Sequence, residues 1–176
     1  MAIPTRASVA PDMPEREFDS THVFDPPRDL VTRWAALAPQ LRSTLRVAAA
    51  FMFLQFGTMK LFAFPIGVPP DGGAVPLMSQ MGLGALLEVI GGSLLLVGLF
   101  TRPVAFLLAG EMAVAYFQFH FPQSFWPVVN QGTPAALYCF VWLYFAAAGA
   151  GPWSLDAVRV HRSHRGDRHD SQAQNW

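Results

Sequence analysis

The chain has 176 residues, a length that suits one domain. Hydrophobic residues make up 52% of it and charged residues only 14%, and the formal net charge is zero. A soluble helical domain would need a charged outer face on each helix, and a nucleic-acid-binding protein would carry a surplus of positive charge. The composition therefore indicates contact with the lipid bilayer and argues against nucleic acid as a partner.

The first segment of the chain is polar. Residues 1–27 are rich in Pro, Asp, Glu and Arg and lack a long apolar run, so they are predicted to be disordered and not a cleavable signal peptide. From Leu30 to Leu37 apolar residues recur at helical spacing, which predicts either a short helix on the membrane surface, ended by Pro39, or a plain linker. Residues 1–40 are assigned to a cytoplasmic tail.

Four apolar stretches follow, at residues 44–64, 82–100, 103–119 and 132–151. Each has roughly 17–21 residues, close to the number that an α-helix needs to cross a bilayer. We therefore expect an all-α fold, an integral membrane four-helix bundle over residues 41–157. A flexible polar tail is expected at residues 158–176.

The positive residues predict how this bundle is oriented. They cluster before and at the start of the first stretch, between the second and third, and after the fourth, at Arg28, Arg33, Arg42, Arg46, Arg102, Arg159, Arg162, Arg165 and Arg168. Residues 66–81 and 120–131, the other two connections, contain no Lys or Arg. Because cytoplasmic loops are positive, both termini are predicted to be cytoplasmic. The expected location is the bacterial inner (plasma) membrane, as a multi-pass protein.

Apart from Arg46 at the start of the first stretch, three charged residues lie inside the apolar stretches, Lys60, Glu88 and Glu111. Such residues are costly in a membrane and usually face the protein interior. Counting 1.5 Å per residue from the arginines at the ends of the stretches puts Lys60 and Glu88 at the same depth, about 21 Å in. Glu111 falls nearer the midplane, at about 14 Å.

Neighbouring residues extend this candidate polar site. Glycines share the Glu88 face of the second stretch, which indicates a face in close contact with another helix. Gln118 lies on the same stripe as Glu111, and Tyr138 falls near the depth of Lys60. The candidate ligand site therefore comprises Lys60, Glu88, Glu111, Tyr138 and Gln118, with no metal and no assigned catalytic residue.

Three interpretations of the site stay open. A purely structural Lys60–Glu88 pair would be closed and dry, and the protein would then dock partners without chemistry. A ligand site for a quinone or a small oxidised species would adjoin a polar cavity, and its two carboxylates near one lysine would suit proton handling. A small-solute or proton transporter, acting as an oligomer, would need a polar route from Glu111 toward Arg102.

The residue inventory limits the redox chemistry. Cys139 is the sole cysteine, so the chain lacks the pair that dithiol exchange needs and the ligands of an iron–sulfur cluster. No histidine pair lies within the apolar stretches, and no nucleophile stands near a base. No stand-alone catalytic machinery is visible, so whether the chain is an enzyme stays open. Any electron transfer would need an external cofactor or partner.

Four segments carry a resemblance to a known family. They are FGTMKLF at residues 56–62, LEVIGG at 87–92, LVGLFTRP at 96–103 and GAGPWSLD at 149–156. In this order, with a lysine in the first stretch and a glutamate before Gly-Gly in the second, the set resembles the DoxX family of small four-span membrane proteins. The similarity covers residues 41–157, most of the chain.

The resemblance implies a function as well as a fold. Some relatives are subunits of quinol oxidase or thiosulfate:quinone oxidoreductase systems, and others are linked to thiol and oxidative-stress homeostasis. The resemblance thus implies an accessory subunit of such a redox system, a possible oxidoreductase subunit. It would have no intrinsic cofactor and a quinone as the candidate external one. A redox-enzyme partner and a homo-oligomer are both compatible with it.

The chain departs from the family pattern at one position. Relatives often carry a glutamate after Asn-Gly-Gly at the start of the fourth stretch, where this chain has Thr133. If that glutamate handles protons or substrate in relatives, the step is altered here. Alternatively, Asn130 and Gln131 simply cap the start of the helix.

Overall fold

The computed structural model describes residues 28–161. The disorder predicted for residues 1–27 and most of the predicted flexible tail, residues 162–176, lie outside this range. The described start of that tail, residues 158–161, is helical and continues a turn that begins at residue 155. Within residues 28–161 the only β-structure is a single bridge between Val68 and Gly73, so the described chain is all-helical.

The first helix, α1, spans Arg28–Phe62 and contains Pro39. The expectation that Pro39 ends the N-terminal helix is therefore wrong. A proline removes one backbone hydrogen bond and tends to bend a helix, but the hydrogen bonds on either side can hold it together. Here the Ser43 hydroxyl also donates to the Pro39 carbonyl at 3.2 Å.

The N-terminal turns of α1, up to Ala35, belong to a compact unit of their own. Their apolar side chains are exposed, among them Leu30, Val31 and Trp34. Within the described residues of this unit, this apolar helix face is therefore left uncovered.

The second unit begins at Ala36 and holds the remaining helices. They are α2 (Gln80–Val97), α3 (Thr101–Ala115) and α4 (Thr133–Ala148). Helix α3 continues directly into a π-helical turn, η1 (Tyr116–His120). Ser79 caps α2 by accepting a hydrogen bond from the Gly82 amide at 3.0 Å. Gly98, with φ of 71°, ends it in the left-handed conformation that glycine favours.

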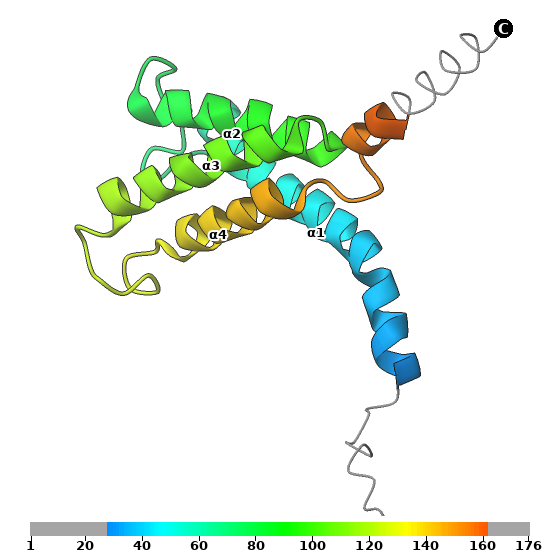
Figure 1. Ribbon diagram of the computed structural model, residues 1–176. Helices are drawn as coiled ribbons and strands as arrows, with labels where there is room; N and C mark the ends of the chain where they lie inside the picture. Colours follow the sequence, from blue (N-terminus) through cyan, green and yellow to red (C-terminus); the bar gives the residue numbers. More distant parts are fainter. Residues whose placement is uncertain (1–27, 162–176) are drawn as a thin grey trace, which may run out of the picture. The chain divides into compact units, whose positions relative to one another are not determined.

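Glycines and large apolar residues build the interior of this unit. The helices α2, α3 and α4 lie alongside one another (Figure 1), with contacts between α2 and α3 and between α3 and α4. Helix α1 joins them through Gly92 of α2, whose added Cβ would stand 3.0 Å from Leu54 Cγ. The core holds Phe53, Leu95, Leu108, Trp142 and Phe145, all fully buried.

Two of the helices, α1 and α2, are long and apolar enough to cross a membrane, and α4 is a shorter apolar helix. Large apolar side chains stay exposed on all four, for example Phe51, Ile90, Phe106 and Phe140. Exposed large apolar side chains on every helix suit helices that face lipid.

Candidate functional site

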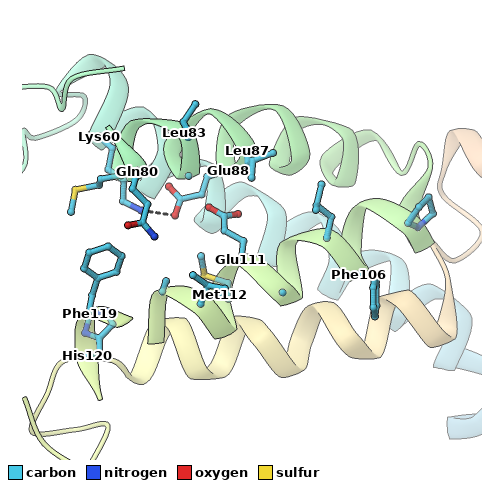
Figure 2. A pocket seen from close by; sticks show the side chains of 17 residues that line it. Lys60, Gln80, Leu83, Leu87, Glu88, Phe106, Glu111, Met112, Phe119 and His120 are labelled. Atoms are coloured by element: carbon cyan, nitrogen blue, oxygen red, sulfur yellow. Dashed lines mark hydrogen bonds and ion pairs between the residues drawn. The ribbon is translucent and has the colours of Figure 1, made fainter. Parts of the chain in front are cut away.

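The Lys60 ammonium and the Glu88 carboxylate form an ion pair, with 2.6 Å between Nζ and Oε1 (Figure 2). The Glu88 side chain is 1% exposed and that of Lys60 is 23% exposed. Gly57, one turn before Lys60, lets α1 approach α2, because a Cβ there would stand 2.7 Å from Val89 Cγ2. The two residues that the sequence placed at the same depth are thus in contact.

Glu111 brings a second carboxylate to the same place from α3. Figure 2 shows the carboxylates of Glu88 and Glu111 directed toward a shared space. Glu111 faces Gly84 of α2, where an added Cβ would stand 3.1 Å from its Oε1. The Oε2 atoms of Glu88 and Glu111 are both buried and have no hydrogen-bond partner among the described residues. Two carboxylates and one ammonium therefore line the same space, and the ammonium is paired with Glu88.

A pocket of about 900 Å³ opens beside these groups, between α2 and α3. We call it the acidic pocket; it is lined by Lys60, Gln80, Met81, Leu83, Gly84, Leu87, Glu88, Pro103, Phe106, Leu107, Gly110, Glu111, Met112, Val114, Ala115, Phe119 and His120. Its polar lining is gathered toward the end where α2 begins and α3 finishes (Figure 2). Toward Pro103 and Phe106 the lining is apolar.

The other two predicted site residues, Gln118 and Tyr138, are placed differently from Glu111, which lines the acidic pocket. Gln118 is hydrogen-bonded to Gln80, whose side chain lines the acidic pocket. Tyr138 is not part of the lining of the acidic pocket. It stacks on Trp142, with ring centroids 5.5 Å apart, and packs against Phe53 of α1 at 5.0 Å. Helix α4 is apolar on all sides, so its sequence does not reveal which way Tyr138 faces.

Two polar residues of the lining, Gln80 and His120, are not among the five predicted site residues. Gln80 precedes the predicted second stretch and carries no charge, so no signal marked it. His120 is the first residue after the predicted third stretch, and its ring Nδ1 lies 2.9 Å from the Asn130 carbonyl oxygen. That contact fixes the ring at the edge of the acidic pocket.

Arg46 was interpreted only as a marker of orientation, yet it is fully buried. Its guanidinium donates to the carbonyls of Leu95 and Leu96 at the end of α2, and to those of Ala150 and Trp153 after α4. Nearby, the Asp156 carboxylate accepts hydrogen bonds from the amides of Phe100 and Thr101, each at 2.9 Å. We call this set, Arg46 and Asp156 with their backbone partners, the arginine junction.

The remaining predictions concern Asn130, Thr133 and Cys139. The Asn130 side chain accepts a hydrogen bond from the Gly132 amide at 2.7 Å, which shapes the turn before α4, but no side chain caps α4 itself. Thr133 is the first residue of that helix. Cys139 is a free thiol on α4 and does not line the acidic pocket. Within residues 28–161 no three His, Cys, Asp or Glu side chains are grouped as metal ligands.

Comparison with known proteins identifies the family. The DoxX family model matches residues 41–121, and DoxX proteins are membrane-associated. An uncharacterised protein of Haemophilus influenzae is 42% identical over 123 residues, which cover 67% of this chain and 90% of the relative. No solved structure matches the chain. The chain belongs to the DoxX family.

Proposed function

We propose that this protein is a four-span inner-membrane subunit of a quinone-linked redox system, and that the acidic pocket binds the quinone headgroup. The observation that carries the proposal is the Lys60–Glu88 ion pair, set beside Glu111 in the wall of an apolar pocket of about 900 Å³. Small-molecule sites are typically apolar clefts of 300–1,000 Å³ with a few convergent polar groups.

The polar groups suit quinone carbonyl oxygens. A bound quinone supplies two-electron, two-proton redox chemistry. The Lys60 ammonium has three N–H donors, and only one is needed for Glu88. Glu111 and Glu88 each present a buried oxygen without a partner, where a proton can be held close to the ligand. The apolar wall at Leu87, Leu107 and Phe106 would exclude water and accept the ring substituents and tail.

The other interpretations of the site have less support. A purely architectural pair predicts no cavity, whereas the pair lines the acidic pocket. A proton or solute route predicts polar groups between Glu111 and Arg102, but the lining on that side is Gly110, Leu107, Phe106 and Pro103. Thiol exchange would need a second thiol near the pocket, and Cys139 lies on another helix. Electrons would come from a partner that carries a flavin, haem or similar redox group.

The proposed topology places both termini in the cytoplasm and the loops at residues 63–79 and 121–132 outside. It is supported by the arginine distribution and by the exposed apolar surface of the helices. Single cysteines at Asp71 and Ser124, in a Cys139→Ala background, should react with a membrane-impermeant maleimide added to intact spheroplasts. A cysteine at Ala157 should react only after lysis, and the reverse pattern would reject the topology.

Quinone binding is tested by titrating the purified protein in detergent with a short-chain ubiquinone and a short-chain menaquinone, using calorimetry. Lys60→Met should weaken binding about tenfold or more, because a charge-assisted hydrogen bond contributes about 1.5–3 kcal/mol. Asp71→Asn is the matched control, since Asp71 lies in a loop outside the pocket. Equal affinity in the wild type and Lys60→Met, or no binding of either quinone, would contradict the proposal.

A further inference from the structure

A second pocket, of about 730 Å³, lies where α3 begins and α4 ends. Its charged lining is Arg42, Arg102, Arg159 and Asp156, with His161 beside them. We call it the basic pocket. Because α3 and α4 are apolar helices, a pocket at their ends would lie at the level of lipid headgroups.

Two of these arginines hold the end of α4 and keep donors to spare. Arg42 Nη1 donates to the Ala148 carbonyl at 2.8 Å, and Arg102 Nη1 donates to the Ala147 carbonyl at 2.5 Å. A guanidinium has five N–H donors in a planar fork. Arg42 Nε is buried and has no hydrogen-bond partner among the described residues. The hydrogen bonds of both side chains within the described residues use Nη1, so Nη2 of each can bind a further acceptor.

Gly149 leaves space next to the second of these arginines. Its φ is 78°, and an added Cβ would stand 3.4 Å from Arg102 Nη2 and 3.5 Å from Nε. The Nε–Nη2 edge is one of the edges through which arginine binds carboxylate or phosphate with two parallel hydrogen bonds. A side chain at position 149 would lie in contact with it.

The single carboxylate in the lining does not balance the arginines. Both oxygens of Asp156 already accept backbone N–H groups, from Phe100 and Thr101. The two guanidiniums of Arg42 and Arg102 against this one carboxylate leave a positive surplus. The Arg159 guanidinium lies 4.7 Å from the centroid of the Phe100 ring, which adds an apolar wall to the basic pocket.

We infer that the basic pocket binds the phosphate of an anionic phospholipid. The fork of Arg102 and the spare donors of Arg42 match phosphate oxygens, and the apolar residues Phe100, Pro103 and Val160 in the lining match the glycerol and upper acyl carbons. Basic pockets at the ends of spanning helices bind anionic headgroups in this way. The inference does not depend on quinone binding in the acidic pocket.

Native mass spectrometry of the full chain in detergent tests whether the basic pocket prefers an anionic phospholipid. Phosphatidylglycerol and phosphatidylcholine of identical acyl chains are added separately. The wild type should retain phosphatidylglycerol about tenfold more tightly than phosphatidylcholine. Arg42→Gln and Arg102→Gln should each reduce that preference several-fold. Arg33→Gln, which removes an arginine outside the pocket, should leave it unchanged.

Because Arg42 and Arg102 also hold the end of α4, circular dichroism should verify the helix content of each variant. Arg42→Lys and Arg102→Lys give a second route: they keep the charge but lose the fork, so an intermediate preference is expected. Equal retention of both lipids by the wild type would overturn the inference. So would displacement of phosphatidylglycerol by millimolar inorganic phosphate, which would assign the pocket to a free anion.

Discussion

The acidic pocket and the arginine junction are both built from buried charges, but they differ in how fully their hydrogen bonds are made. In the junction, every nitrogen of the Arg46 guanidinium donates to a backbone carbonyl and both oxygens of Asp156 accept backbone amides. In the acidic pocket, Glu88 and Glu111 each keep a buried oxygen without a partner among the described residues.

The difference separates architecture from binding. A buried polar group that lacks a hydrogen-bond partner lowers the stability of the fold. The unpartnered carboxylate oxygens of the acidic pocket are therefore expected to destabilise the fold while they remain available to a ligand. The junction joins the end of α2 to the chain after α4, and four of the five N–H donors of Arg46 already bind backbone carbonyls. The acidic pocket has both spare capacity and space.

The largest expected effect is at the arginine junction. Arg46→Gln removes most of the donors that serve four backbone carbonyls, and hydrogen bonds to charged groups contribute about 1.5–3 kcal/mol each. We expect unfolding in detergent to become easier by about 4 kcal/mol, measured by denaturant titration. Arg33→Gln, an exposed arginine outside the junction, should change it by less than about 0.5 kcal/mol. Equal effects would mean that the junction does not hold the helices together.

The Lys60–Glu88 pair should respond in a different way. Lys60→Met or Glu88→Leu alone leaves a buried charge without its partner and should cost about 2–3 kcal/mol. The double variant should recover to within about 1 kcal/mol of wild type, because buried pairs are often replaceable by apolar residues. Failure of the double variant to recover would show that the pair is architectural, like the junction.

Glu111 should matter little for stability. Its Oε2 has no partner, so Glu111→Gln is expected to shift the unfolding free energy by less than about 1 kcal/mol. The same variant should weaken quinone binding several-fold, measured by calorimetry. A loss of stability comparable to that of Arg46→Gln would place Glu111 with the architectural charges.

The smallest changes in stability are expected from alanine substitutions at two glycines, Gly57 and Gly110. Gly57→Ala should destabilise by about 1–3 kcal/mol, because its Cβ would meet Val89 at 2.7 Å. Gly110→Ala has no atom within 4 Å of the added Cβ and should be neutral or stabilising by up to about 1 kcal/mol, because alanine favours the helix. Thermal unfolding in detergent separates the two, and a neutral Gly57→Ala would mean that α1 and α2 do not approach closely.

The sequence predicted part of this arrangement for a simple reason. Residue counts from the arginines at the ends of the apolar stretches give depth, so Lys60 and Glu88 could be placed at one level. Depth does not give rotation, which is why Tyr138 was expected at the pair but lies among aromatic rings. Arg46 was missed because its partners are backbone carbonyls distant in sequence, such as those of Leu95 and Trp153, and carbonyls leave no mark in a residue pattern.

The most direct test of the central claim is quinone affinity of the Lys60→Met/Glu88→Leu double variant, measured after its stability has been shown to match wild type. If the acidic pocket is a ligand site, the double variant stays folded and binds the short-chain quinone at least about tenfold more weakly. If the folded double variant binds as tightly as wild type, the Lys60–Glu88 pair is not part of a quinone site and the account fails.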